Sequence, residues 1–253
     1  MKPDWTPLRH ALQEYRRSGL NLPVWWRDDD VTAPSSPLDQ LHRLAESLDF
    51  PVHLAVIPGV AQETLAELTA TSDHMVPLVH GWLHQNNTPA GAKKAEFGLY
   101  TKDGADNLTL ALTQMRRLFG ELFLPVFVPP WNRIDPVYAD CLGAAGYRGL
   151  STFTARSAPM AAPGLVQINT HIDPVDWHGT RSLKDPDLLI SQTVDVLLAR
   201  RTGAADPAEP LGYLTHHLIH TAELWDFSHS FLQEMLDGGA AVQPITPLLE
   251  TGT

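Results

Sequence analysis

The chain has 253 residues, of which 43% are hydrophobic and 19% are charged, a composition typical of a globular protein with room for one α/β barrel or two small domains. Its formal net charge of −11 argues against a nucleic acid or an anionic membrane as partner, because both would require a basic surface. The single cysteine excludes an internal disulfide framework.

The N-terminal segment lacks the apolar core of a signal peptide. No part of the sequence approaches the roughly 20 apolar residues that a membrane-spanning helix needs. We therefore expect a cytoplasmic protein that does not associate with membranes.

Short apolar segments alternate with longer amphipathic segments along the whole chain. The apolar segments predict strands at Pro23–Trp26, Val52–Ile57, Val76–His80, Pro125–Val128, Gly149–Phe153, Leu165–Thr170, Gly212–Thr215 and Val242–Ile245. The amphipathic segments predict helices, and three have recognisable ends: one capped by Ser36 and opened by Pro37, one from Asp103 to Gly120, and one that starts at Asp135–Pro136 and ends at Gly146.

This alternation predicts an α/β fold with a parallel sheet and helices outside it. About eight strands in about 250 residues is the proportion of a (β/α) barrel. A doubly wound open sheet is the alternative, but the sequence contains neither a dinucleotide-binding Gly-x-Gly-x-x-Gly nor a phosphate-binding loop. No shift in composition marks a boundary, so we expect a single domain over residues 1–253.

Polar side chains follow five of the predicted strands. These groups are Asp28–Asp30, His80, Pro129–Asn132, His171–Trp177 and His216–His217. In (β/α) barrels the chemistry takes place at the C-terminal ends of the strands, which lie on one rim. We therefore expect these side chains to meet there.

The aspartate triplet and a histidine pair predict a metal site. Adjacent carboxylates repel one another, and a divalent cation would offset that repulsion. His80 and His84 are four positions apart, so on a helical turn both rings could reach one ion at about 2.1 Å. Two imidazoles and one carboxylate leave coordination positions open, which is typical of catalytic zinc sites. The alternatives are a solvated acidic turn and a structural histidine pair.

In this order and at these strand ends, the motifs resemble those of the polysaccharide deacetylases of carbohydrate esterase family four, whose NodB-type fold is an irregular (β/α)7-8 barrel. The resemblance runs from about Pro23 to His220. It implies that Asp29 is the catalytic base, with Asp28 as the alternative register. It also implies one divalent metal ion, zinc in the first place, with cobalt, manganese or nickel as alternatives; its ligands would be Asp30, His80 and His84.

The third motif of the family places prolines and an aromatic residue after an arginine. Here Pro129–Asn132 keeps the prolines and the aromatic, but Val128 replaces the arginine. The resemblance assigns the backbone N–H of Trp131 to the oxyanion of the reaction and assigns Pro130 and Asn132 to substrate binding. A rigid, partly buried turn is the alternative interpretation of this segment.

The missing arginine normally pairs with the catalytic aspartate. We therefore predict that the guanidinium of Arg27 or Arg133 lies within hydrogen-bond distance of Asp29 or Asp173.

The last two motifs supply the general acid. Residues 173–177 follow the family pattern Asp-x-x-Asp-Trp, which implies that Asp173 orients the catalytic histidine and that Trp177 walls the acyl pocket. The fifth motif ends a strand with the acid itself, and His216 and His217 are the candidates. Adjacent residues of a strand face opposite sides, so only one can enter the site, and we predict His216.

The function implied is a metal-dependent hydrolase that deacetylates an N-acetylated sugar or a related amide. Its substrate would be a small molecule or an oligosaccharide; no nucleic acid or membrane is expected as partner, and the sequence leaves the oligomeric state open. One alternative is a non-catalytic descendant that binds metal or sugar, since the motif-three arginine is absent. The other is a different TIM-like metal hydrolase that cleaves another C–N or ester bond.

Overall fold

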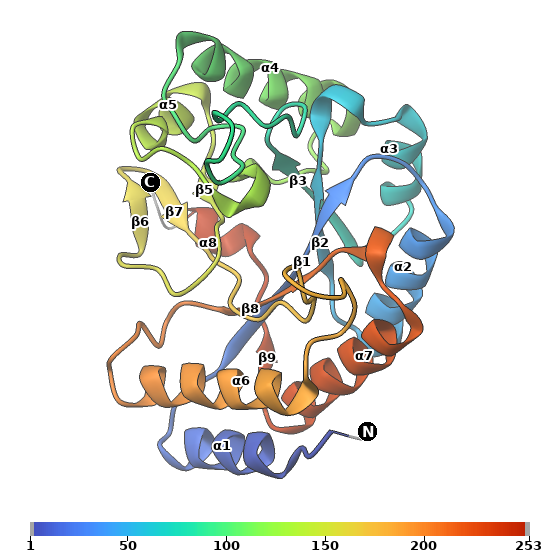
Figure 1. Ribbon diagram of the computed structural model, residues 1–253, viewed down its shortest axis with the longest axis vertical. Coiled ribbons are helices and arrows are strands. Elements are labelled where there is room, and N and C mark those ends of the chain that lie inside the picture. Colours follow the sequence, from blue (N-terminus) through green and yellow to red (C-terminus); the bar gives the residue numbers. More distant parts are fainter. Residues whose placement is uncertain (1–2, 251–253) are drawn as a thin grey trace.

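The strands of the computed structural model, which describes residues 3–250, form one curled sheet (Figure 1). Their order is β6-β7-β5-β4-β3-β2-β1-β8, and β9 pairs with the start of β1. All pairs are parallel except β6 with β7. The strands are β1 (Pro23–Val31), β2 (Val52–Val56), β3 (Met75–His80), β4 (Val126–Val128), β5 (Gly149–Leu150), β6 (Met160–Ala162), β7 (Leu165–Gln167), β8 (Leu211–Thr215) and β9 (Ala241–Val242).

Helices surround the sheet, and α1 lies beside α6 (Figure 1). The α-helices are α1 (Thr6–Arg17), α2 (Ser36–Leu48), α3 (Glu63–Thr69), α4 (Lys102–Phe119), α5 (Tyr138–Ala145), α6 (Pro186–Arg201), α7 (Ala222–Asp237) and α8 (Thr246–Glu250). The short 3-10 helices η1 (Pro58–Val60), η2 (Pro130–Asn132) and η3 (His217–Ile219) follow β2, β4 and β8. The segment η2 contains Pro130, Trp131 and Asn132, which the sequence assigned to the site.

The curled sheet approaches closure next to β8. After β7 the chain returns along this strand: the N–H of His171 donates to the carbonyl of Gly212 at 2.8 Å, and Ile172 forms a parallel bridge with Tyr213. The result is an irregular barrel that a single bridge closes, instead of a continuous strand pair. The predicted α/β barrel is therefore confirmed, in this less regular form.

Two apolar clusters flank the strands, and they define the inner and outer faces. Trp25 belongs to the smaller cluster inside the barrel, whereas Val24 and Trp26 belong to the large cluster between sheet and helices. Because side chains alternate along a strand, those of Arg27 and Asp29 point into the barrel, as the side chain of Trp25 does. The sheet therefore delivers both polar side chains into the barrel interior beyond the apolar cluster.

The predicted strands are all present, with differences at their ends. The first strand continues to Val31 and so includes the aspartate triplet. The strands predicted at Gly149–Phe153, Leu165–Thr170 and Val242–Ile245 are shorter than expected, and β6 was not predicted. The short strands lie where the sheet is irregular: Phe153 and Thr170 pair only through an isolated bridge.

The predicted helices form, with corrections at two N-termini. The N-cap of α2 is Ser35 and not Ser36, because the hydroxyl of Ser35 accepts the N–H of Leu38 at 3.2 Å. The helix expected from Asp135 begins only at Tyr138. Gly120 and Gly146 follow the last residues of α4 and α5, as predicted.

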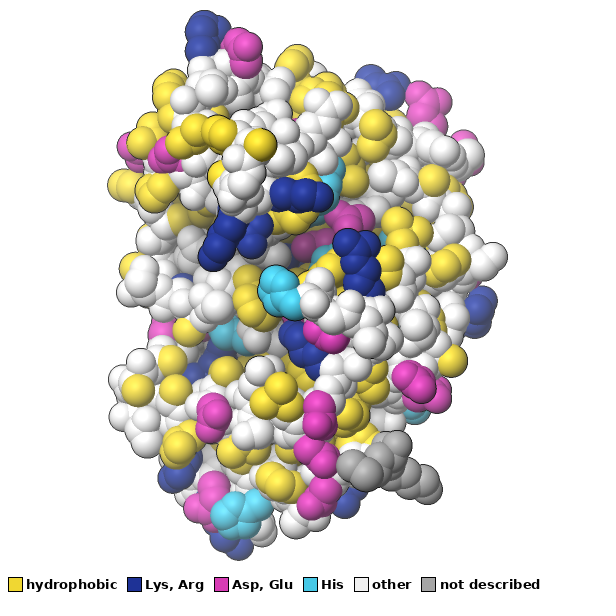
Figure 2. Space-filling model, in the orientation of Figure 1, with side chains coloured by type: hydrophobic (Ala, Val, Ile, Leu, Met, Phe, Trp, Pro, Cys, Tyr) yellow, Lys and Arg dark blue, Asp and Glu magenta, His cyan; other side chains and the backbone are white. Residues whose placement is uncertain are grey.

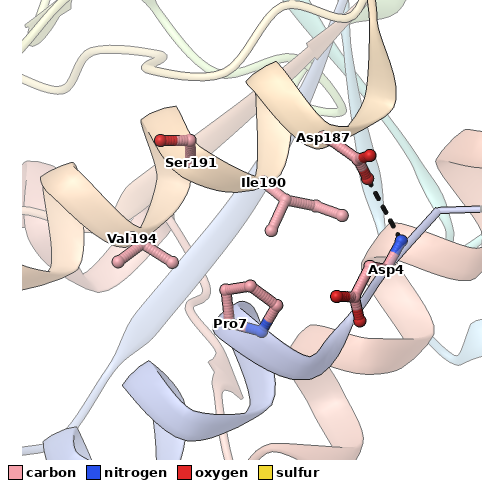
Figure 3. Close-up of a pocket in the computed structure, with 6 residues that line it drawn as sticks. All are labelled: Asp4, Pro7, Asp187, Ile190, Ser191 and Val194. Carbon is pink, nitrogen blue, oxygen red and sulfur yellow. Dashed lines mark hydrogen bonds between the residues drawn. The ribbon is translucent and has the colours of Figure 1, made fainter.

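No helix within residues 3–250 is long and apolar enough to cross a membrane. A cavity of about 310 Å³ lies between α1 and α6 and is lined by Asp4, Pro7, Asp187, Ile190, Ser191 and Val194 (Figure 3). The backbone N–H of Asp4 donates to Asp187 across it at 3.1 Å. This cavity lies at the contact between two helices, and none of the residues that line it was assigned to the site from the sequence.

Candidate active site

The three aspartates at the end of β1 do not face the same side of the sheet. Asp29 lies inside with Arg27, whereas Asp28 bonds to groups on the outer face. Alternation would send Asp30 outward as well. However, the pairing of β1 with β2 shifts register between Asp28 and Val31, and Asp30 has a left-handed φ of 70°. This irregularity turns Asp30 inward, so two adjacent carboxylates line the site.

The carboxylate of Asp30 meets two imidazoles. Its Oδ1 lies 3.2 Å from Nε2 of His80 and 3.2 Å from Nε2 of His84, and ligand atoms of the three residues lie within 4.8 Å of one another. The Nδ1 of His80 donates to the carbonyl of Val128 at 2.9 Å, which leaves Nε2 as the ligand atom. This donor set is that of catalytic zinc sites, so the three residues fit a divalent ion.

The charges of this cluster are coupled. Burial opposes ionisation of Asp30, but the hydrogen bond from His80 and the charges of His80, His216 and His84 outweigh it and lower the pKa of Asp30. Burial also opposes protonation of His80, yet Asp30 and Asp29 raise its pKa. Burial and the charge of His80 lower the pKa of His84. An ionised Asp30 between two rings is an environment that favours a cation.

His84 lies on an irregular loop and not on the helical turn that its spacing from His80 predicts. The loop has left-handed φ values at Gly81 (58°) and His84 (55°). The two rings still lie close together, with centroids 5.1 Å apart. The predicted shared helical face is therefore wrong, and a different backbone path brings both rings to Asp30.

Arg27 is fully buried and holds Asp29 with both sides of its guanidinium. Its Nε donates to Oδ1 of Asp29 at 2.8 Å and its Nη2 to Oδ2 at 3.0 Å. Nη2 also donates to Oδ1 of Asn132 at 2.6 Å, and Nη1 donates to Oγ of Ser151 at 2.7 Å. Such a bidentate pair fixes both the position and the plane of the carboxylate.

The prediction that an arginine replaces the one missing before Pro129 is confirmed for Arg27. Arg133 is exposed, and its Nη1 donates to the carbonyl of Lys94 at 2.8 Å. The arginine therefore lies in β1, two residues before Asp29, and not at the end of β4, where the family pattern has it and where this chain has Val128.

The residues of η2 form one wall of the site. The ring of Trp131 packs on His84 with centroids 4.3 Å apart, and Pro130 is buried against Gly81. Trp131 and Asn132 both have left-handed backbones, with φ of 57° and 56°. Such conformations cost about 1–3 kcal/mol each and persist where the surroundings hold them. The hydrogen bond from Arg27 occupies the side-chain oxygen of Asn132.

The predicted hydrogen bond between Asp173 and His216 is not formed. Its Oδ1 accepts the N–H of Val175 at 2.9 Å and its Oδ2 accepts the indole N–H of Trp177 at 2.7 Å. Within the described part of the chain, no hydrogen bond joins Asp173 to His216, whose buried Nδ1 has no partner. Trp177 packs edge-on against the His216 ring, with centroids 4.7 Å apart. Asp173 therefore fixes the indole, and the indole contacts the histidine.

His217 lies on the outer face with Asp28, opposite to the site. Nδ1 of His217 lies 2.5 Å from Oδ1 of Asp28, whose Oδ2 accepts the backbone N–H of His217 and the hydroxyl of Thr215. Burial opposes ionisation of Asp28, but His217 and Thr215 outweigh it and lower the pKa of this carboxyl. Both carboxylate oxygens of Asp28 thus have partners other than Asp30, His80 and His84.

Two residues near the site were not singled out from the sequence. Ser151 lies in a predicted strand segment, and its hydroxyl binds Arg27. Glu96 lies in the loop before α4 and binds the backbone of residues 82–84. Strand alternation could have pointed to Ser151, but a single glutamate in a polar loop carries no sequence signal.

Figure 2 shows a hollow near the middle of one face of the molecule, in which acidic and histidine side chains are visible. Lys and Arg side chains surround this hollow, although the chain as a whole carries a net charge of −11.

Comparison with known proteins relates this fold to solved structures. A protein from Mycobacterium smegmatis assigned as a polysaccharide deacetylase matches with a TM-score of 0.64 and 15% identity, over 92% of this chain and 90% of that one. A family 4 carbohydrate esterase from Streptomyces lividans, in complex with acetate, matches with a TM-score of 0.55 and 15% identity, over 92% and 96% of the two chains. A pseudoenzyme of the same family from Bacillus anthracis matches with a TM-score of 0.54 and 14% identity, over 90% and 66%.

No protein-family model and no curated protein matches the sequence. The structural matches show that the chain has the NodB-like fold of the family 4 carbohydrate esterases. Because this fold includes a pseudoenzyme, fold alone does not decide whether the site is catalytic.

Replacing Arg27 by lysine tests the buried ion pair. Lysine keeps the charge, but its single ammonium group cannot replace the planar guanidinium, whose separate N–H groups donate to Asp29, Asn132 and Ser151. We expect the unfolding free energy, measured by urea denaturation at pH 7, to fall by about 1–3 kcal/mol, because buried acceptors lose their donors. The matched control is Arg133→Lys, an exposed change expected to alter it by less than about 0.5 kcal/mol. Equal losses in the two variants would contradict the assignment.

Proposed function

We propose that this chain is a metal-dependent hydrolase that removes the acetyl group from an N-acetylated sugar or a related amide. The observation that carries the proposal is the placement of two differently supported carboxylates on one site. Asp30 shares its oxygen with His80 and His84, and Asp29 beside it is held by Arg27. Separate environments for adjacent groups are what a ligand and a general base require.

Asp30, His80 and His84 would hold the ion, for which zinc is our first choice and cobalt, manganese or nickel are alternatives. When bound, a divalent ion would polarise the scissile carbonyl and lower the pKa of the attacking water. The hydrogen bond from His80 to Val128 supports this role, because it orients the ring before any ion binds.

Asp29 is the proposed general base. Arg27 fixes both of its oxygens, and each oxygen keeps a second lone pair that can accept the proton of a water molecule. Asp28 is the weaker candidate because Thr215 and His217 occupy its carboxylate on the outer face.

His216 is the proposed general acid, which protonates the departing amine. Alternation from Leu214 places it on the inner side of β8, and its charge acts on Asp30. Trp177 sets the orientation of the ring and would form one wall of the acyl pocket. The role of Asp173 is to fix Trp177 through the indole N–H.

The backbone N–H of Trp131 is proposed to donate to the developing oxyanion. The left-handed backbone of Trp131 and Asn132 supports this, because it is held before substrate binds by the bond between Asn132 and Arg27. Pro130 and Asn132 would contribute to the substrate-facing wall.

A non-catalytic role is the second candidate, since Val128 stands where the family has arginine and since a pseudoenzyme shares the fold. Arg27 weakens this candidate because it restores the arginine–aspartate pair from another strand. A wild-type protein that binds metal but releases no acetate from a panel of N-acetylated sugars would favour it.

The roles of the two inner aspartates can be separated by substitution. Asp30→Asn replaces a ligand carboxylate by a poor amide ligand and should weaken zinc affinity by more than the roughly 10–100-fold that loss of an outer-shell partner causes. Asp29→Asn should keep the metal and lower kcat by about 10²–10⁴-fold, because it removes the base. Zinc content by elemental analysis and acetate release from N-acetylglucosamine oligomers are the two measurements.

Asp28→Asn is the control for both variants, and the folded protein should keep its metal and its turnover. Loss of turnover in Asp28→Asn together with full activity in Asp29→Asn would show that the base is assigned one residue too late.

The two adjacent histidines should also separate. His216→Ala is expected to lower kcat by about 10²–10⁴-fold with the metal retained. His217→Ala leaves the buried Asp28 without its charged partner and is expected to lower the unfolding free energy by about 3–5 kcal/mol, with turnover per folded molecule preserved. If His217→Ala abolishes turnover in folded, metal-loaded protein and His216→Ala does not, the assignment of the acid is wrong.

A further inference from the structure

Glu96 is a buried carboxylate that, among the described residues, forms no hydrogen bond to the side chain of Asp29, Asp30, His80 or His84. Its side chain binds three consecutive backbone N–H groups of the loop after β3. Oε2 accepts from Trp82 at 3.1 Å and from His84 at 3.2 Å, and Oε1 accepts from Leu83 at 2.8 Å. Glu96 is only 6% exposed, so these bonds replace its contacts with water.

The three N–H groups converge because of the backbone around them. Left-handed conformations at Gly81 and His84 bend residues 81–84 around the carboxylate, and successive N–H groups in such a bend form a concave anion site. Here the chain itself supplies the anion. A neutral amide could not accept all three bonds, because it offers one oxygen where the carboxylate offers two.

The position of Glu96 also explains why residue 81 is glycine. A Cβ at Gly81 would overlap Oε2 of Glu96 and would lie 2.6 Å from Cγ of Pro130. Gly81, directly after β3, is thus packed closely against both Glu96 and Pro130. The residue after Glu96, Phe97, bridges Ile134, which ties the same segment to the chain after η2.

The two histidine rings are held in different ways. Nδ1 of His80 donates to a strand carbonyl, so the sheet orients that ring. Within the described residues, no hydrogen bond from another residue reaches Nδ1 of His84, and the ring has only its contact with Trp131 beside Asp30 and His80. The left-handed backbone of His84 therefore sets the direction in which its ring points, and the hydrogen bond to Glu96 fixes that backbone.

We propose that Glu96 is a positioning residue of the metal site, which acts through the backbone of Trp82–His84 to hold His84 toward Asp30. This inference rests on the proposed metal binding. Loss of the carboxylate releases the loop, and His84 then reaches the metal position only part of the time. The effect is a weaker metal site with unchanged ligand identities.

The test compares Glu96→Gln with Glu209→Gln. Glu209 is another buried carboxylate, 1% exposed, that accepts the backbone N–H groups of Arg156 and Asn169 and pairs with His171, and none of these residues is a proposed metal ligand. Zinc affinity is measured by competition with a chromophoric chelator, and the ligand field is followed by the visible absorption of the cobalt-loaded protein. Thermal unfolding of the metal-free proteins measures the general loss of stability.

We expect Glu96→Gln to weaken zinc affinity by at least about tenfold and to change the cobalt spectrum. Glu209→Gln should lower Tm without either effect. Unchanged affinity in Glu96→Gln, or equal weakening in both variants, would overturn the proposal. If Glu96→Gln does not fold, Glu96→Asp is measured in the same way, since its shorter carboxylate reaches fewer of the three N–H groups and should weaken affinity in the same direction.

The wild-type measurements separate this proposal from the proposed function. A wild-type protein that binds zinc without releasing acetate would contradict the proposed deacetylase function. The role of Glu96 would then still be decided by the zinc affinities of the Glu96 and Glu209 variants. A wild-type protein that binds neither zinc nor cobalt overturns both.

Discussion

The buried ion pair between Arg27 and Asp29 is the interaction on which the arrangement of the site depends. A guanidinium inside a barrel is tolerated only when its N–H groups are paired, since removal from water costs several kcal/mol per ion. The pairing partners beyond Asp29 are Asn132 after β4 and Ser151 after β5. The guanidinium of Arg27 therefore ties three strand ends together, and movement of the end of β4 or β5 would leave buried N–H groups of Arg27 without their partners.

Backbone strain is concentrated around the same point. Of the seven non-glycine residues with left-handed φ in the described part of the chain, four line the site: Asp30, His84, Trp131 and Asn132. Each is held by a specific contact, such as the bond from Arg27 to Asn132 or from His84 N–H to Glu96. Strain that persists under such contacts is typical of preorganised sites, in which binding does not have to select one loop conformation from many.

Much of this arrangement could be predicted from the sequence, because it follows from the period of two along strands. Alternation places Arg27 and Asp29 inside, and it separates His216 from His217. It fails at Asp30, where a shift of register sends two adjacent side chains to one side. The sequence does not predict that shift, because three identical aspartates show no alternation of polar and apolar side chains between the two faces of the strand.

The side-chain contacts of the loops could not be predicted from the sequence. The spacing of His80 and His84 suggested a helical turn, but residues 82–84 form an irregular loop whose N–H groups donate to Glu96. Asp173 matched a family pattern residue for residue, and yet its carboxylate binds the indole of Trp177 instead of His216. In both cases a long-range side-chain contact decided the outcome, and such contacts leave no local signal in a single sequence.

In the proposed site, one ion is bound jointly by Asp30, His80 and His84. The most direct measurement is X-ray absorption at the zinc edge of the zinc-loaded protein, with His84→Ala as the comparison. We expect a first shell of nitrogen and oxygen at about 2.0–2.2 Å that includes two imidazoles, one of which is lost in His84→Ala. A zinc shell without imidazole scattering, or an identical shell in the two proteins, would contradict it.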